Sequence, residues 1–124
     1  MRSTSLLHAT PALLLASCSP ITQVCTLIGC DDLLEVQCSR TPDGPVRVEA
    51  FTAPGAEPRV VECPAEHGCS TVSFRDLVAE RVTIRVTTAA GIRSQEFTPR
   101  YENQYPNGRR CGAVCTQATI TFQL

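Results

Sequence analysis

Apolar and polar residues alternate with a period of two along most of the chain beyond residue 30. The clearest segments are 81–88 (RVTIRVTT) and 117–124 (QATITFQL), in which apolar residues recur at every second position. Such alternation predicts β-strands with one buried and one solvated face. The remaining candidate strands are shorter or less regular: 33–39, 46–52, 59–63, 71–75 and 92–98.

Turn-forming residues separate these segments, at 41–45 (TPDGP), 53–55 (APG), 89–91 (AAG) and 105–108 (YPNG). Proline presets one turn dihedral, and glycine and asparagine accept the positive φ that other residues resist. Residues 76–80 (DLVAE) fit a single helical turn, and no longer segment has a helical pattern. Seven short strands at roughly ten-residue spacing predict an antiparallel β-sandwich of the immunoglobulin-like or Greek-key type.

The inward positions of these strands predict a mostly aliphatic core. Aromatic residues make up 5% of the chain and Trp is absent, so this core is light. Covalent cross-links would therefore contribute much of the stability. The core residues we expect are Leu34, Val36, Val48, Val60, Phe74, Val82, Ile84, Val86, Ile120 and Phe122.

The N-terminal segment has the features of an export signal. Arg2 provides a positive charge, and the short apolar run 6–16 is interrupted by His8 and Pro11. This run is too short for a membrane-spanning helix, which needs ~20 apolar residues. A charged start followed by a short apolar run is typical of a signal peptide.

The sequence LASC at 15–18 resembles the lipobox of bacterial lipoprotein precursors. The resemblance implies cleavage before Cys18, a diacylglyceryl group on its thiol, and acylation of the new amino terminus with a chain such as palmitate. Two or more long acyl chains hold a protein firmly on a bilayer. Ser19 at the next position implies sorting to the outer rather than the inner membrane. The alternative is an ordinary secretory signal, with Cys18 an incidental or disulfide-forming cysteine.

These features divide the chain into three parts. Residues 1–17 are the expected signal peptide, residues 18–24 a lipidated N-terminus and short tether, and residues 25–124 a β-sandwich domain. The expected location is therefore the bacterial cell envelope, with the membrane as a partner through the lipid on Cys18.

The chain has eight cysteines, of which seven remain if Cys18 carries lipid. Disulfides are the default in an exported protein, and an odd number leaves one thiol over. Cys38 is our candidate for the free thiol, because strand alternation turns it inward, where it would act as a small hydrophobic residue. The six cysteines expected in disulfides are Cys25, Cys30, Cys63, Cys69, Cys111 and Cys115.

Spacing determines the pairing of these six only in part. Cys63 and Cys69 enclose a short loop that contains Gly68, and we pair them. The cysteines at 25 and 30 and those at 111 and 115 either close two local loops or cross-link the two ends of the domain. Cross-linking removes more entropy from the unfolded chain, about 4–5 kcal/mol against about 2–2.5 kcal/mol for a local loop, and we favour it.

Both ends of the expected domain are similar to a group of small lipoproteins from myxobacteria and related high-GC bacteria. The similar segments are 25–30 (CTLIGC) and 101–115, which contains PNGRRCGAVC. The group shares a C-T-x-I-G-C start and a Y…P-N-G-x-x-C-x-x-x-C block before a final strand. The resemblance implies a secreted β-domain with paired terminal cysteines and no assigned activity. Cys38 departs from the pattern of the group.

Composition excludes several functions. The formal net charge is −1, which argues against nucleic-acid binding. Lysine is absent, which excludes Schiff-base chemistry and a P-loop. His67 is the one histidine beyond the signal, and cysteines that close a loop cannot also be reactive thiolates. We expect no enzymatic activity and no cofactor.

Two small clusters carry metal-ligand residue types. Cys63, His67 and Cys69 would suit zinc or copper, but outside the cytoplasm a disulfide is favoured. Asp31 and Asp32 supply two carboxylates, far short of the six to eight oxygens that Ca²⁺ requires. We therefore predict no metal site.

Residues 100–110 (RYENQYPNGRR) are the most distinctive surface candidate, because tyrosines, amides and arginines in a loop are typical of binding sites. The alternative is a structural connection held at Cys111. Arg47, Arg81 and Arg85 fall on outward strand positions and predict a solvated face. The candidate binding residues are Tyr101, Asn103, Tyr105, Arg109 and Arg110.

Together these observations predict a lipid-anchored cell-envelope protein that acts as a non-catalytic binding or surface-interaction module with a protein or glycan partner. The alternatives are a structural or accessory subunit of an envelope complex, or a metal- or redox-active periplasmic protein.

Overall fold

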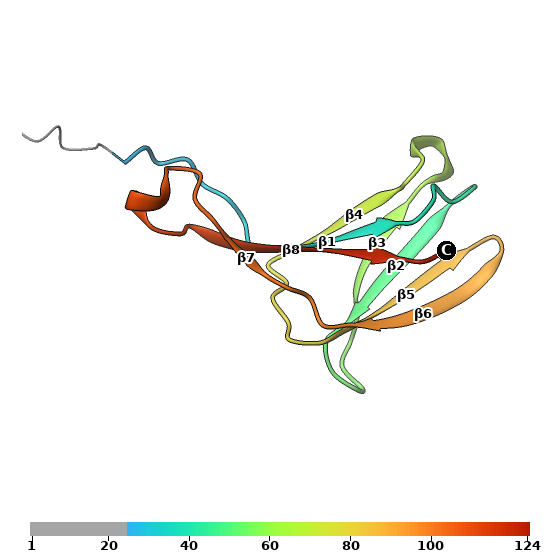
Figure 1. Ribbon diagram of the computed structural model, residues 1–124. Coiled ribbons are helices and arrows are strands. Elements are labelled where there is room, and N and C mark those ends of the chain that lie inside the picture. The colour runs from blue at the N-terminus through green and yellow to red at the C-terminus, as the bar shows by residue number, and fades with distance from the viewer. Residues whose placement is uncertain (1–24) are drawn as a thin grey trace, which may run out of the picture.

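The computed structural model describes residues 25–124, which form eight strands and two short 3-10 helices (Figure 1). The helices η1 (Ala65–His67) and η2 (Arg109–Cys111) lie in connections between strands. The strands are β1 (Leu33–Cys38), β2 (Val46–Phe51), β3 (Arg59–Cys63), β4 (Thr71–Arg75), β5 (Val82–Thr88), β6 (Gly91–Phe97), β7 (Glu102–Gln104) and β8 (Cys115–Phe122).

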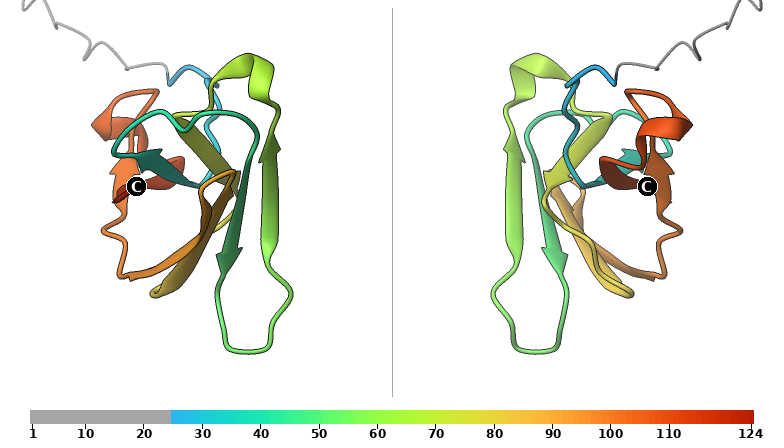
Figure 2. Two further views of the ribbon diagram at one scale, coloured as in Figure 1. Left: turned by 90° about the vertical axis from the view of Figure 1, so that its right-hand side faces the viewer. Right: turned by 90° about the vertical axis from the view of Figure 1, so that its left-hand side faces the viewer.

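Two four-stranded sheets pack against each other, with the orders β4-β1-β8-β7 and β3-β2-β5-β6. β1 and β8, at the centre of the first sheet, run parallel, and the other neighbours are antiparallel. The β2–β3 and β5–β6 hairpins make up the second sheet. Figure 2 shows the β2–β3 hairpin (green) reaching beyond the other strands at its 52–58 turn.

The predicted all-β sandwich is confirmed, and the seven expected strands lie within two residues of their expected bounds. The described chain adds an eighth strand, β7, whose sequence ENQ carries no apolar alternation that could have revealed it. The parallel pairing of β1 with β8 is also a departure from the expected antiparallel arrangement, so the first sheet is mixed.

The prediction of a helical turn at 76–80 is wrong, because these residues form no helix. Asp76 adopts a left-handed conformation, with φ of 58°, and its backbone N–H donates to the carbonyl oxygen of Asp32 at 2.7 Å. This turn ends β4 and directs the chain towards the second sheet. Leu77 then enters the core, where it is 5% exposed.

The inward side chains of both sheets form one core, and every expected core residue except Val60 is buried. Val60 is 41% exposed, because it lies opposite Glu49 on the outer face of the second sheet. Its neighbour Val61 lies opposite Val48 and packs against the core instead. Of two adjacent valines in a strand only one can face inward, and the register with β2 selects Val61.

The expected signal peptide (1–17) and tether (18–24), including Cys18, lie outside the described residues. Within residues 25–124, no helix has both the length and the apolar character needed to cross a membrane.

Candidate functional site

Two disulfides join the beginning of the described chain to the segment that leads into β8. Cys25 bonds to Cys111 and Cys30 to Cys115, with Cα atoms 5.7 and 5.8 Å apart. The cross-linked arrangement is therefore present, and local pairing within 25–30 or 111–115 is excluded. We call residues 25–32 and 104–116, which these bonds join, the terminal clasp.

The other cysteines agree with the predictions from loop spacing, for Cys63 and Cys69, and from strand alternation, for Cys38. Cys63 and Cys69 form a disulfide around η1. Within residues 25–124, Cys38 is the cysteine without a disulfide partner. Its thiol is half-buried at the end of β1, and desolvation raises its pKa. A raised pKa lowers the thiolate fraction and makes Cys38 a poor nucleophile.

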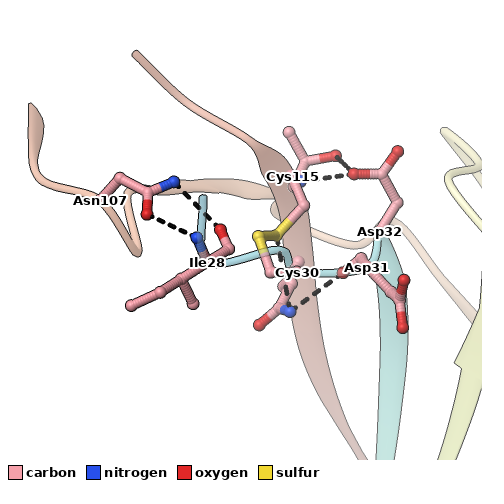
Figure 3. Close-up of a disulfide and its surroundings, with 8 residues drawn as sticks. Ile28, Cys30, Asp31, Asp32, Asn107 and Cys115 are labelled. Carbon is pink, nitrogen blue, oxygen red and sulfur yellow. Dashed lines mark hydrogen bonds between the residues drawn. A yellow bond between two sulfur atoms is a disulfide. The ribbon is translucent and has the colours of Figure 1, made fainter. Parts of the chain in front are cut away.

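Asn107 holds the N-terminal part of the clasp in place. Its side-chain oxygen accepts hydrogen bonds from the backbone N–H of Ile28 at 2.9 Å and from the hydroxyl of Thr26 at 2.7 Å. Its side-chain nitrogen donates to the carbonyl oxygen of Ile28 at 3.0 Å (Figure 3). Asn107 was expected only as a turn residue. Its bridging role could not be read from the sequence, because the partners lie 79 and 81 positions away.

The second half of the clasp is fixed beside the Cys30–Cys115 disulfide. The carboxylate of Asp32 accepts the backbone N–H of Thr116 at 2.7 Å, and the side chain of Gln117 donates to the carbonyl oxygen of Asp31 at 3.0 Å (Figure 3). These bonds align residues 31–32 with β8 directly before β1 begins. The bonds of the clasp therefore continue the parallel register of β1 and β8.

Most of the predicted binding loop belongs to this clasp. The hydroxyl of Tyr101 accepts the backbone N–H of Ala79 at 2.9 Å, and its ring packs against the core, so Tyr101 has a structural role. Asn103 is an exposed residue of β7. Tyr105 is half-buried, and the guanidinium of Arg109 lies 5.5 Å from its ring centre. Arg109 and Arg110 are exposed on η2.

The outer face of the second sheet holds a charged network that the sequence did not predict. Glu49 is 5% exposed although it points outward, because Arg85 covers it. The Arg85 guanidinium donates two hydrogen bonds to the Glu49 carboxylate, at 2.9 and 2.8 Å, and lies 4.8 Å from the ring centre of Phe51. Arg47 lies 3.7 Å from Glu49 and bonds Glu62 at 2.7 Å. Arg47 and Arg85 are therefore ion-paired, which corrects the prediction of a merely solvated face.

The network lowers the pKa of Glu49 below its ordinary value of 4.5, chiefly through the hydrogen bonds from Arg85. A carboxyl group whose pKa is lower in the folded state stabilises the fold above its ordinary pKa. That contribution is lost as the pH falls from 4.5 through the lowered value. The same pair raises the pKa of Arg85, which stays charged throughout.

We expect the Glu49→Gln variant to be less stable than the wild type at pH 7, with the difference shrinking towards pH 3. Urea unfolding at both pH values measures this difference. Glu62→Gln is the matched control, because Glu62 is exposed and contacts only Arg47 among the ion pairs of the described residues. An equal loss for both variants at pH 7, or a Glu49→Gln loss that does not change with pH, would contradict the assigned role of the network.

Beside this network lies a hollow of about 570 Å³. Cross-strand register places Phe51, Thr83 and Glu96 in one row across β2, β5 and β6, and Arg85 and Ser94 in the next. The turn after β2 closes one side of the hollow. Hydroxyls, one carboxylate and arginines line it together with the ring of Phe51 and the apolar atoms of Ala53 and Pro54. A second hollow, of about 660 Å³, lies near the other end of the same strands, beside Cys63, Pro64 and Thr87.

The two small clusters of metal-ligand residue types do not form metal-binding sites. The sulfur atoms of Cys63 and Cys69 are bonded to each other. The Asp31 carboxylate lies 3.6 Å from Arg75, whereas Asp32 accepts from Thr116, so the two carboxylates face different partners. Across residues 25–124, no group of three or more His, Cys, Asp or Glu side chains is placed to hold a metal ion.

Fold and site together define a disulfide-stapled β-sandwich with a cross-linked terminal clasp and two hollows on the outer face of one sheet. Comparisons with protein-family models, with curated proteins and with solved structures find no match.

Proposed function

We propose that the chain is a lipid-anchored protein of the bacterial cell envelope that presents a non-catalytic binding domain. The observation that carries the proposal is the terminal clasp. Two disulfides fix residues 25–30 to the body of the domain, directly after the tether that would join it to lipid at Cys18. Three disulfides in 100 described residues also suit an exported protein, since disulfides persist in oxidising compartments.

The anchor is tested by replacing Cys18 with alanine. We expect the wild type to incorporate labelled palmitate and to partition into detergent, and the Cys18→Ala variant to do neither, because it lacks the thiol that accepts the lipid. Cys38→Ala is the matched control and keeps both properties. Label on the Cys18→Ala variant, or none on the wild type, would contradict lipidation at Cys18.

We assign the binding role to the hollow beside Phe51, with a hydroxyl-rich ligand such as an oligosaccharide. Arg85 is paired with Glu49, and the carboxylate of Glu96 also lines the hollow, so a strongly anionic ligand gains little. Thr83 and Ser94 can donate and accept hydrogen bonds, and Phe51 offers apolar contact to the C–H groups of a sugar. Its volume lies within the usual range of about 300–1,000 Å³ for ligand pockets.

An array of neutral and charged oligosaccharides tests this assignment. We expect binding of neutral glycans, weakened by about tenfold or more in Glu96→Ala, because a hydrogen bond to a charged group contributes about 1.5–3 kcal/mol. Glu62→Ala, an exposed glutamate beside the second hollow, is the matched control. The absence of glycan binding, or equal losses in both variants, would remove the hollow as the binding site.

A further inference from the structure

The terminal clasp exposes three large apolar side chains. Leu27 is fully exposed, Ile28 is 56% exposed and Val114 is 45% exposed. In Figure 3 the side chain of Ile28 extends away from the Cys30–Cys115 disulfide. The clasp holds the backbone around these residues in place, so they cannot fold back onto the core to escape water.

Basic and aromatic groups accompany these apolar side chains. Arg109 and Arg110 are exposed on η2, next to Cys111 and its bond to Cys25. Arg109 lies against the ring of Tyr105. Of the two acids in the clasp, Asp31 is paired with Arg75 and Asp32 accepts a hydrogen bond from the backbone of Thr116. Exposed aliphatic groups beside arginine and tyrosine are the composition of surfaces that sit in a membrane interface.

We propose that this surface of the clasp, made of Leu27, Ile28, Arg109, Arg110 and Val114, rests on an anionic lipid bilayer. The inference rests on the proposed anchor. Leu27 is nine residues after Cys18, and an extended chain of that length spans at most about 30 Å. The anchored domain therefore keeps its clasp end near the bilayer, and the arginines match the negative surface potential of anionic lipids.

A bilayer suits this surface better than a protein partner does. A stable protein interface buries about 1,200–2,000 Å², far more than three aliphatic side chains provide. A membrane contact needs no such area here, because the anchor raises the effective concentration of the surface at the bilayer. Figure 1 shows the clasp at one end of the molecule and the β5–β6 turn at the other, so this contact would hold the β5–β6 turn away from the membrane.

The absence of Trp from the chain allows a direct test with single reporters. The acylated mature protein, residues 18–124, is inserted into phosphatidylglycerol-rich vesicles that carry brominated lipid, with either Leu27→Trp or Ile92→Trp. Both sites are exposed, and Ile92 lies beside the β5–β6 turn at the far end. We expect bromine quenching at least about threefold stronger, with a blue-shifted emission, for Leu27→Trp. Adding Arg109→Gln and Arg110→Gln should reduce that quenching.

The outcomes separate the inference from the anchor. Acylated Leu27→Trp protein that is quenched no more than Ile92→Trp would overturn the membrane contact and leave the anchor in place. A blue shift that grows with protein concentration without bromine quenching would assign the surface to a second copy of the chain and also overturn the proposal. Mature protein without acyl chains would instead contradict the proposed function.

Discussion

Replacing all four clasp cysteines with serine is expected to leave the domain largely unfolded at physiological temperature. The Cys25–Cys111 and Cys30–Cys115 disulfides each close a loop of about 85 residues. Chain-entropy arguments give about 4–5 kcal/mol for the first such link. Once it is present, the second closes a ring of only about ten residues and adds about 3 kcal/mol. The sum of about 7 kcal/mol is comparable with the whole stability of a small domain, about 5–15 kcal/mol.

Because the two clasp disulfides join the same two segments, the stability losses from removing them should not be additive. Removing either clasp disulfide alone should cost only about 3 kcal/mol, because the other still holds the two ends together. Removing both should cost about 1–2 kcal/mol more than the sum of the two single losses. Urea or thermal unfolding of the two double-serine variants and the quadruple variant measures the three values.

The matched control removes the remaining disulfide. Cys63→Ser with Cys69→Ser opens a loop with a sequence separation of only 6, so its expected cost is about 2 kcal/mol. The role of the clasp would be contradicted by a quadruple variant that is as stable as this control. It would also be contradicted if the stability losses of the two double-serine variants added up to the loss of the quadruple variant.

Replacing Phe122 with alanine is expected to cost about 3–5 kcal/mol, the usual range for removing a buried phenylalanine. Phe122 lies at the end of β8, is 1% exposed, and its ring centre is 6.4 Å from that of Phe97 on the opposite sheet. Its loss leaves a cavity between the two layers.

Thermal unfolding measures the effect, and a domain of this size should melt at least about 12 °C lower. Phe51→Ala is the matched control, because Phe51 is half-buried on the outer face and its loss opens no interior cavity. Equal losses in the two variants would contradict the core described above.

Strand positions followed from the sequence because the two faces of each sheet differ so clearly in polarity. Residues 82, 84 and 86 alternate with threonine and arginine, and that pattern admits a single inward face. At such positions the sequence of one strand predicts which of its side chains are buried, without knowledge of the adjacent strands. The same local reasoning identified Cys38 as the unpaired cysteine and paired Cys63 with Cys69.

Features that depend on register between strands could not be derived in this way. The burial of Glu49 requires Arg85 directly opposite on β5, and the exposure of Val60 requires Glu49 beside it. The bonds of Asn107 to Ile28 and Thr26 depend on the parallel pairing of β1 with β8, which no local pattern records. Sequence spacing identified residues 100–110 as distinctive but could not show that Tyr101 packs on the core.

Intact mass measurement tests most directly whether the protein is a lipid-anchored domain held by three disulfides. The mature protein is taken from native envelope, denatured without reductant and alkylated, and a second sample is reduced first. We predict the mass of residues 18–124 with a diacylglyceryl group and an N-acyl chain. One thiol, that of Cys38, should react before reduction. Seven should react after it, the eight cysteines of the chain less Cys18. A mass without acyl chains, or two or more reactive thiols before reduction, would contradict the account.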